Sequence, residues 1–426
     1  MNILVIGSGG REHSILKKLS ESKKVSRLYC LPGNAGTSEL AENIGSQFMA
    51  QDKLIEFVKN NSIDLTVIGP EQPLIEGYAD RFIKEGLNVF GPESKAAVIE
   101  GSKAFSKDLM HKYNIPTANY KNFTDYDQAK EYLSKQTVPI VIKVSGIAAG
   151  KGAIVCLTRE EAEKTLKSMM VDKEFGEAGD EVVIEEFLTG EEASIFAVSD
   201  GNYYKILPTA QDHKAIFDGD KGPNTGGMGS YSPAPIINDE LMEDIQKSII
   251  APTFDAMKSE NRTYKGVLFV GLMITGEGPK VIEYNCRFGD PETQVILPKY
   301  DGDLAELLME AATSKFTGNE ILPAKNEHYL CLVLASGGYP SSYVKGYTID
   351  GLDRRDENTS VIHAGTKVEN EKIVTSGGRV LGIVSRGNTL KEAKERSYNF
   401  ADQIKFKDKY CRNDIGDKGI NRYDNK

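Results

Sequence analysis

Strands and helices alternate over the first hundred residues. Four apolar runs have the length and residue types of buried strands: NILVI at 2–6, RLYCL at 27–31, DLTVI at 64–68 and LNVF at 87–90. Between them, KLIEFVKNN and YADRFIKEG place apolar residues at helical spacing. Because a strand followed by a helix returns to its sheet by a crossover, this order predicts a doubly wound parallel sheet of the α/β class.

Each predicted strand runs into a loop that contains glycine or proline. These loops are GSGGRE, PGNAGT, GPEQPL and GPES. In an open parallel sheet the ligand crevice lies beyond the carboxyl ends of the strands, where such loops gather. We therefore expect a small-molecule site at this edge of the sheet.

The first loop does not match the dinucleotide-binding motif GxGxxG. Gly7, Gly9 and Gly10 are followed by Arg11 and Glu12, so the last glycine is missing, and no acidic residue ends the second strand. Glycines and backbone amides at the start of a helix suit a phosphate. A tight strand-to-helix turn explains the same residues, so both interpretations stay open.

The composition indicates a multidomain globular protein without nucleic acid or membrane partners. The 426 residues, 40% of them hydrophobic, can fill two or more domain cores. A net charge of -10 argues against binding to nucleic acid phosphates, and five scattered cysteines without CxxC spacing indicate neither disulfides nor zinc. With no apolar run of about 18 residues and no signal peptide, we expect a cytoplasmic location.

The segment PIVIKVSGIAAGKGAIV, residues 139–155, places two lysines at a loop of small residues. Two β-rich runs flank the loop, with Lys143 before it and Lys151 within it. Glycine and alanine permit close backbone approach, and a lysine in such a loop can meet an anionic phosphate. A plain hairpin with an exposed lysine is the alternative.

The segment EVVIEEFLTGEEASIF, residues 181–196, has the pattern of a nucleotide-binding connector. Apolar Phe187 and Leu188 could stack on adenine while backbone groups read its edge, and Glu191 could accept ribose hydroxyl hydrogen bonds. A solvated acidic strand end explains this segment alone equally well.

The segment VIEYNCRFGDPETQ, residues 281–294, carries unusual charge for a strand. Side chains on a strand repeat with period two, so Glu283 and Asn285 point to one face, about 7 Å apart along the backbone. Their oxygens are the ligands that Mg²⁺ prefers. A strand end fraying into solvent fits less well, because Asp290-Pro291 makes a defined turn immediately afterwards.

Motifs spread over almost the whole chain resemble the ATP-grasp superfamily and, within it, the phosphoribosylamine-glycine ligase (glycinamide ribonucleotide synthetase) family. RFGDPETQ together with GPNTGGMG carries most of the specificity. The full set is GSGGREH, PGNAGT, GPEQPL, EGSKAFSKDLM, AAGKG, IEEFLTGEEAS, QDHKAIFDGDKGPNTGGMGSYSP, IEYNCRFGDPETQ, HAGT and SGGRVLGI. In many members of the superfamily the preceding strand supplies another acidic metal ligand, and GVLFVGLMI at 266–274 offers none, so the number of ions stays open.

The resemblance implies an ATP-dependent ligation in purine biosynthesis. ATP would phosphorylate glycine to glycyl phosphate, and the amine of 5-phosphoribosylamine would attack the acyl carbon, giving glycinamide ribonucleotide, ADP and phosphate. Mg²⁺ or Mn²⁺ would assist, and transient contact with neighbouring purine-pathway enzymes is expected. The alternatives are another ATP-grasp carboxylate-amine ligase or carboxylase, and a nucleotide-binding regulator without catalysis.

Three domains are expected. Residues 1–102 would form the N-terminal substrate-binding α/β domain, and residues 103–324 a two-lobed α+β ATP-grasp core with a mobile lobe at about 117–190. The strands YLCLVLASGG and RVLGIVSRG, followed by a helix from Leu390, predict a small mixed α/β C-terminal domain at 325–426 that packs against the ATP site.

The resemblance implies three catalytic residues: Lys151, Arg287 and Asp290. Lys151 would lie on a loop that closes over the phosphates and shields the acyl phosphate from water. Arg287 would hold a carboxylate or the transferred phosphoryl group through its planar fork, and a structural salt bridge with Asp290 or Glu292 is its alternative role. Asp290 would help to receive the amine.

The remaining site residues follow from the same resemblance. Nucleotide-binding residues are expected to be Lys103, Lys143, Glu185, Glu186, Phe187, Leu188 and Glu191. Substrate-binding residues are expected to be Gly10, Arg11, Glu71, Asp212, His213, Lys214, Thr225, Gly226 and Gly227, and the metal ligands Glu283 and Asn285.

Overall fold

The N-terminal sheet is parallel and doubly wound, as the sequence predicts. The computed structural model describes residues 1–148 and 150–425, and its first sheet has the strand order β3-β2-β1-β4-β5. The strands are β1 (Asn2–Gly7), β2 (Arg27–Pro32), β3 (Glu42–Asn43), β4 (Leu65–Ile68) and β5 (Val89–Phe90). The helices are α1 (Gly10–Ser20), η1 (Thr37–Glu39), η2 (Ser46–Met49), α2 (Gln51–Asn60), α3 (Glu71–Ile75) and α4 (Tyr78–Lys84).

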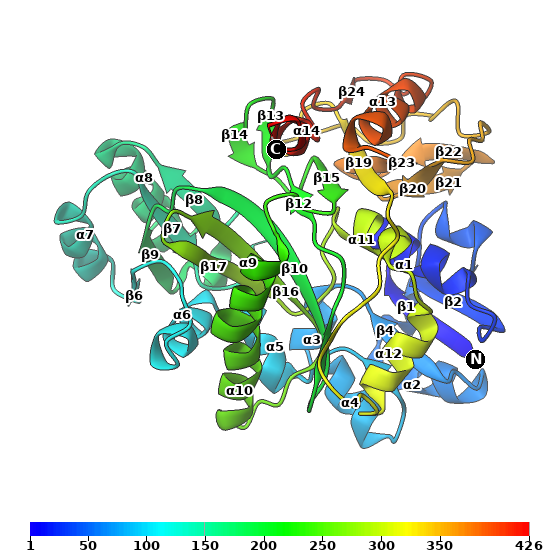
Figure 1. Ribbon diagram of the computed structural model, residues 1–426, viewed down its shortest axis with the longest axis horizontal. Helices are drawn as coiled ribbons and strands as arrows, with labels where there is room; N and C mark the ends of the chain where they lie inside the picture. Colours follow the sequence, from blue (N-terminus) through cyan, green and yellow to red (C-terminus); the bar gives the residue numbers. More distant parts are fainter. Residues whose placement is uncertain (149, 426) are drawn as a thin grey trace.

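A four-stranded antiparallel sheet forms a separate lobe at one end of the molecule (Figure 1). Its strands, in the order β6-β9-β7-β8, are β6 (Tyr120–Phe123), β7 (Ile140–Val144), β8 (Ala153–Cys156) and β9 (Val182–Glu186). Helices α5 (Ser94–Gly101) and α6 (Lys103–Lys112) lead into it, and α7 (Tyr126–Ser134), α8 (Arg159–Met170) and η3 (Gly176–Gly179) complete it. The lobe has a hydrophobic core of its own, drawn from residues 123–184.

A mixed sheet forms the centre of the molecule, in the strand order β17-β16-β10-β11-β18. Its strands are β10 (Glu191–Asp200), β11 (Tyr204–Ile206), β16 (Lys265–Thr275), β17 (Gly278–Asn285) and β18 (Glu320–Ile321). Its helices are α9 (Asp239–Ile245), η4 (Gln246–Ile250), α10 (Ala251–Ser259), α11 (Thr293–Lys299) and α12 (Leu304–Ala312).

The C-terminal sheet includes two strands from the middle of the chain. Its order is β12-β15-β19-β23-β20, with β24 paired to β19. The strands are β12 (Gln211–Asp212), β15 (Gly229–Ser232), β19 (His328–Ser336), β20 (Thr359–His363), β23 (Arg379–Gly387) and β24 (Lys409–Tyr410). The smaller elements are β13 (Ala215–Phe217), β14 (Lys221–Asn224), β21 (Thr366–Glu369), β22 (Lys372–Thr375), α13 (Leu390–Ala401) and α14 (Asp417–Asp424).

The membership of β12 and β15 places residues 211–212 and 229–232 on the C-terminal sheet, although the sequence assigns them to the 103–324 core. β15 pairs with β19, so Gly229 lies opposite Leu332 and Ser232 opposite Tyr329. The three-domain division therefore stays a prediction, with sheet boundaries that differ from its chain boundaries.

The β13-β14 hairpin is fastened by the C-terminal segment. The Arg412 side chain is fully buried and donates hydrogen bonds to Ala215 O at 3.0 Å, Asp220 Oδ1 at 3.0 Å and both carboxylate oxygens of Asp414 at 2.7 Å. A buried guanidinium needs such partners, because burying an unpaired charge is very costly.

Within residues 1–148 and 150–425, no helix is long and apolar enough to cross a membrane.

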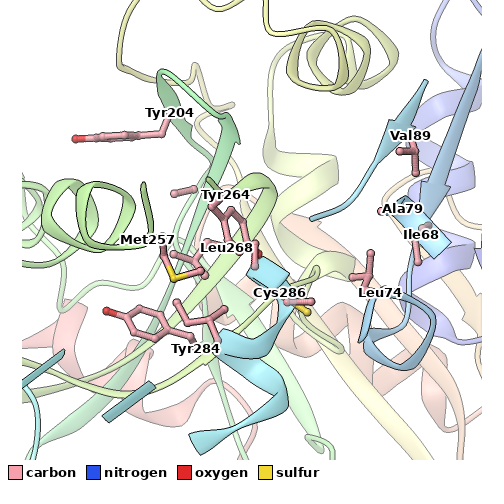
Figure 2. Packing of buried hydrophobic residues seen from close by; sticks show 14 of the residues in the cluster. Ile68, Leu74, Ala79, Val89, Tyr204, Met257, Tyr264, Leu268, Tyr284 and Cys286 are labelled. Carbon is pink, nitrogen blue, oxygen red and sulfur yellow. The ribbon is translucent and has the colours of Figure 1, made fainter. Parts of the chain in front are cut away.

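We predict that Leu268→Ala in β16 lowers the free energy of unfolding by about 2–5 kcal/mol, because it opens a cavity in a packed core. Leu268 is fully buried in a cluster that also contains Met257, Tyr264 and Leu74 (Figure 2). Urea unfolding followed by circular dichroism measures the change. Leu157→Ala, at a side chain that is 64% exposed, is the control, and its free energy of unfolding should stay within about 0.5 kcal/mol of the wild-type value. Equal stability of both variants would contradict the prediction.

Candidate active site

One cavity of about 400 Å³ lies where the four sheets approach one another. Charged side chains come to it from the N-terminal domain (Arg11, Glu71), the separate lobe (Lys143, Glu185), the central sheet (Glu192, Glu283) and the C-terminal sheet (Asp212, Arg379). Apolar side chains line it as well: Met110, Val141, Val155, Phe187, Leu188, Phe269 and Met273. A concave site with an apolar portion and a few converging charges is typical of small-molecule binding.

Two buried lysines grip the Glu185 carboxylate at the lobe side of the cavity. Lys143 lies opposite Val183 in the β7-β9 ladder and Glu185 opposite Val141, so Lys143 and Glu185 are diagonal neighbours on one face. Lys143 pairs with Oε1 of Glu185, and Lys107 Nζ lies 2.5 Å from Oε2. Burial lowers the pKa of Lys107 to about 8 against the attraction of Glu185.

Lys103 is the first residue of α6 and reaches the cavity from there. Ser102 caps the helix by accepting a hydrogen bond from Phe105 N at 3.1 Å. Lys103 Nζ donates to Gly146 O at 3.0 Å, at the start of the small-residue loop. Burial lowers the pKa of Lys103, although the nearby Glu283 opposes the shift.

Lys214 and Glu283 form the centre of the cavity's charge network. Lys214 Nζ lies 2.9 Å from Glu192 Oε2 and 3.3 Å from Glu283 Oε1. Burial would raise the pKa of Glu283, but Lys214, Lys143 and Lys103 outweigh it and lower the pKa to about 2. Glu283 is therefore a carboxylate under all ordinary conditions.

The predicted metal ligands face the cavity together. Asn285 Oδ1 accepts a hydrogen bond from Arg287 Nη2 at 3.0 Å, while its Nδ2 is buried without a hydrogen-bond partner among the described residues. No group of three or more His, Cys, Asp or Glu side chains that could hold a metal occurs in residues 1–148 and 150–425. One carboxylate and one amide fit a hard divalent cation that takes its other ligands from water and nucleotide phosphates.

Arg287 forms ion pairs with Glu71 and Glu100, which differ from the two partners considered from the sequence. Its Nε lies 3.2 Å from Glu71 Oε2 and its Nη2 lies 3.2 Å from Glu100 Oε1, rather than against Asp290 or Glu292. Glu100 also accepts a hydrogen bond from Cys286 N at 2.7 Å. Burial raises the pKa of Glu100 in spite of Arg287.

Acidic and basic groups also meet at the end of the cavity nearest the N-terminal sheet. Burial would raise the pKa of Asp290, but Arg379 and Arg11 hold it below its usual value. The pKa of Asp212 is raised by burial and by the carboxylate of Glu292, which together outweigh Lys214.

Most of the residues predicted for the site line this one cavity. They are Arg11, Glu71, Lys103, Lys143, Glu185, Glu186, Phe187, Leu188, Asp212, Lys214, Thr225, Gly226, Glu283, Asn285, Arg287 and Asp290. Their individual roles stay predictions.

Glu191 and His213 point away from the cavity because side chains alternate along β10 and along the extended segment that follows β12. Glu191 pairs with Arg422 of the C-terminal helix, while its neighbour Glu192 faces the cavity. His213 is buried against Tyr231 with ring centroids 5.8 Å apart, and burial lowers its pKa to about 4. The structure therefore does not bring either residue together with the others.

The other three predicted residues also lie outside the cavity lining. Gly10 is packed so closely that a Cβ there would lie 2.7 Å from Gln294 Nε2. Gly227 has φ +113° and a Cβ there would lie 2.3 Å from Pro291 Cδ, so only glycine suits this turn. Lys151 is exposed, and its Nζ donates to Pro340 O at 2.9 Å.

Five charged residues of the cavity were not predicted: Glu100, Lys107, Glu192, Glu292 and Arg379. Lys107 follows Lys103 by four residues, a spacing that places both on one face of α6, so the helix pattern could have found it. Arg379 belongs to the SGGRVLGI motif, but the motif alone does not indicate that its side chain reaches this site.

The two-lobed fold and the lysine-rich, acid-paired cavity between the lobes define an ATP-grasp ligase. Residues 1–100, 101–293 and 329–418 match the N domain, the ATP-grasp (A) domain and the C domain models of phosphoribosylglycinamide synthetase. The chain belongs to the phosphoribosylglycinamide synthetase family.

Similar proteins span the whole chain. It is 49% identical to a phosphoribosylamine-glycine ligase of Halalkalibacterium halodurans, over 99% of this chain and 97% of that one. It is 47% identical to the Escherichia coli O157:H7 ligase of the same name over the full length of both. The crystal structure of the Thermotoga maritima ligase matches with a TM-score of 0.84 and 32% identity, over 97% of this chain and 100% of that one.

More distant structures share the fold alone. Biotin carboxylase of Campylobacter jejuni aligns with a TM-score of 0.74 at 14% identity, over 96% of this chain and 92% of that one.

We predict that Glu192→Gln lowers kcat/KM by at least about tenfold, because it weakens a charge-assisted contact to Lys214 inside the cavity. Glu191→Gln, one residue away and paired with Arg422, should leave kcat/KM within about twofold. Steady-state assays of ADP formation compare the two variants. The opposite order of effects would show that Glu191, as predicted from the sequence, serves the nucleotide.

Proposed function

We propose that the chain joins glycine to 5-phosphoribosylamine at the expense of ATP, giving glycinamide ribonucleotide, ADP and phosphate in de novo purine biosynthesis. The observation that carries this proposal is the arrangement of one cavity. Lys103 and Lys143 face Glu283 and Asn285 there, beside Arg287, in a chain that matches its family from end to end.

The reaction is proposed to proceed in two steps. A carboxylate oxygen of glycine attacks the γ-phosphorus of ATP, which forms glycyl phosphate and releases ADP. The amine nitrogen of the sugar phosphate then attacks the acyl carbon, the bond from that carbon to the phosphate oxygen breaks, and the amine loses a proton. Neither step needs a nucleophile from the protein, so positioning and charge stabilisation are what the side chains supply.

Lys103 and Lys143 are the proposed phosphate-binding residues. Lys143 is buried and Lys103 is half-buried, and in such places the attraction of an ammonium group for phosphate oxygens is stronger than in water. Phe187 and Leu188 are proposed to contact adenine, at the portion of the cavity that Met110 and Val141 also line. Lys107 is proposed to hold the Glu185 carboxylate in place beside them, which supports the predicted nucleotide role of Glu185.

A divalent cation, Mg²⁺ or Mn²⁺, is proposed to be held by Glu283 and Asn285. The lowered pKa of Glu283 keeps its oxygens available to a cation, and Asn285 adds an amide oxygen. Such an ion would neutralise charge on the transferred phosphoryl group. Lys214 lies within 3.3 Å of Glu283 and provides a positive charge from the protein itself.

The end of the cavity that contains Arg11, Glu71 and Asp290 is proposed to receive the sugar phosphate. Arg11 is the second residue of α1, where the positive end of the helix dipole favours an anion. Asp290 is proposed to take the proton from the attacking amine, since Arg379 and Arg11 keep it ionised. Arg287 is proposed to orient the glycine carboxylate or the phosphoryl group. The cytoplasmic location and the contacts with neighbouring pathway enzymes stay predictions.

The test is ADP formation with ATP, Mg²⁺, glycine and freshly generated phosphoribosylamine, omitting one component at a time. Mass spectrometry should detect glycinamide ribonucleotide only when all four are present. ATP binding without this product would contradict the proposed substrates, and product from another amine or from bicarbonate would support a different member of the superfamily.

We predict that Glu283→Ala reduces kcat at least about 100-fold, since it removes the ionised oxygen donor proposed for the metal. Raising the Mg²⁺ concentration should restore part of the activity, because the cation is then bound by Asn285 and the nucleotide alone. Glu277→Ala, at an exposed residue near the start of the same strand, is the matched control. An unchanged Mg²⁺ dependence in Glu283→Ala would exclude Glu283 as a ligand.

A further inference from the structure

Two residues of the C-terminal domain bond the backbone of a single residue, Gly226, on its N–H and its C=O side. The Tyr339 hydroxyl accepts a hydrogen bond from Gly226 N at 3.1 Å, and Arg379 Nη1 donates to Gly226 O at 2.6 Å. Gly226 lines the cavity, and a Cβ there would lie 2.8 Å from Arg379 Cζ. The glycine therefore lets the guanidinium lie directly against the backbone.

The same guanidinium also reaches the turn at Asp290. Arg379 Nη1 donates to Asp290 O at 2.6 Å, and Nη2 lies 3.4 Å from Asp290 Oδ2. Arg379 thus joins two segments that are distant in the sequence, the glycine-rich loop around Gly226 and the turn after β17. A lysine cannot reproduce this bridge, because it offers one point charge in place of a planar fork of donors.

Close packing of neighbouring segments fixes the backbone at Arg379. A Cβ on Gly365 would lie 2.6 Å from Arg379 O and 2.5 Å from Gly377 Cα. A Cβ on Gly378 would lie 2.2 Å from the Tyr339 ring. The HAGT and SGGR motifs, which the nucleotide and metal sites leave unexplained, therefore supply the glycines that bring Tyr339 and Arg379 to Gly226.

We propose that Arg379, assisted by Tyr339, is a positioning residue for the second step of the reaction: it holds Gly226 and Asp290 at the spacing that receives the sugar-phosphate amine. This inference rests on the proposed function. Arg379 contacts none of Lys103, Lys143 and Glu185 among the hydrogen bonds and ion pairs of the described residues, so its effect should fall on the amine rather than on ATP.

The test compares Arg379→Met and Arg379→Lys with Arg386→Met in the full chain. Arg386 lies on the same strand β23, is 42% exposed at its side chain and bonds Asn358 away from the cavity, so it is a matched control. Arg379→Met should lower kcat/KM for phosphoribosylamine about 100-fold, with KM for ATP within about twofold. The kcat/KM of Arg379→Lys for phosphoribosylamine should lie between the values of Arg379→Met and the wild type. Arg386→Met should have the wild-type value.

Tyr339→Phe removes only the hydroxyl at Gly226 N and keeps the ring packing, so it provides a second test if Arg379→Met folds poorly. Tyr339→Phe should also lower kcat/KM for phosphoribosylamine, by a smaller factor than Arg379→Met. Two results would overturn the inference and leave the proposed function intact. One is an equal loss of kcat/KM for ATP and for phosphoribosylamine, and the other is wild-type kinetics in both Arg379→Met and Tyr339→Phe. Absence of product from the wild type would overturn both.

Discussion

The active site depends on the cost of burying charge. Four lysines, Lys103, Lys107, Lys143 and Lys214, line the cavity, and Lys107 and Lys143 are buried. An ammonium group remains charged in such a place only beside carboxylates, because burial otherwise favours its neutral form. Glu185 serves two of these lysines, and Glu192 and Glu283 serve Lys214. The carboxylates therefore favour the charged form of the lysines beside them, where a nucleotide triphosphate is proposed to bind.

The pairing of strands decides which charges can meet. Diagonal neighbours in the β7-β9 ladder bring Lys143 to Glu185, and β16 carries Met273 opposite Glu192, so both of those side chains reach the cavity. The alternation of side chains along a strand then excludes Glu191 and His213, although both stand next to cavity residues in the sequence. A register shift of one residue in β10 would turn Glu191 toward the cavity and Glu192 away from it.

The sequence predicted what local pattern and motif determine. Alternating strands and helices identified the N-terminal sheet, and the motifs identified Asn285 and most of the charged residues that line the cavity, including Glu283. The sequence did not predict that β12 and β15 join the C-terminal sheet, because pairing between strands a hundred residues apart leaves no periodic signal. Glu191 was preferred to Glu192 since adjacent glutamates give no indication of which one faces inward. Arg379 was missed for the same reason as the strand exchange: its partners Gly226 and Asp290 are remote in the chain.

The two ends of the cavity are built on different hydrophobic cores. One continuous cluster includes Ile3 of the N-terminal sheet, Phe196 of the central sheet and Val384 of the C-terminal sheet, so these three sheets share a packed interior. The lobe with β6–β9 is packed around a separate cluster. Relative motion of elements that share a core would break close packing, whereas a lobe with its own core can move without that cost. The end of the cavity that contains Arg379 and Asp290 is therefore fixed by the shared core, and any closure over the nucleotide has to come from the lobe that carries Lys143 and Glu185.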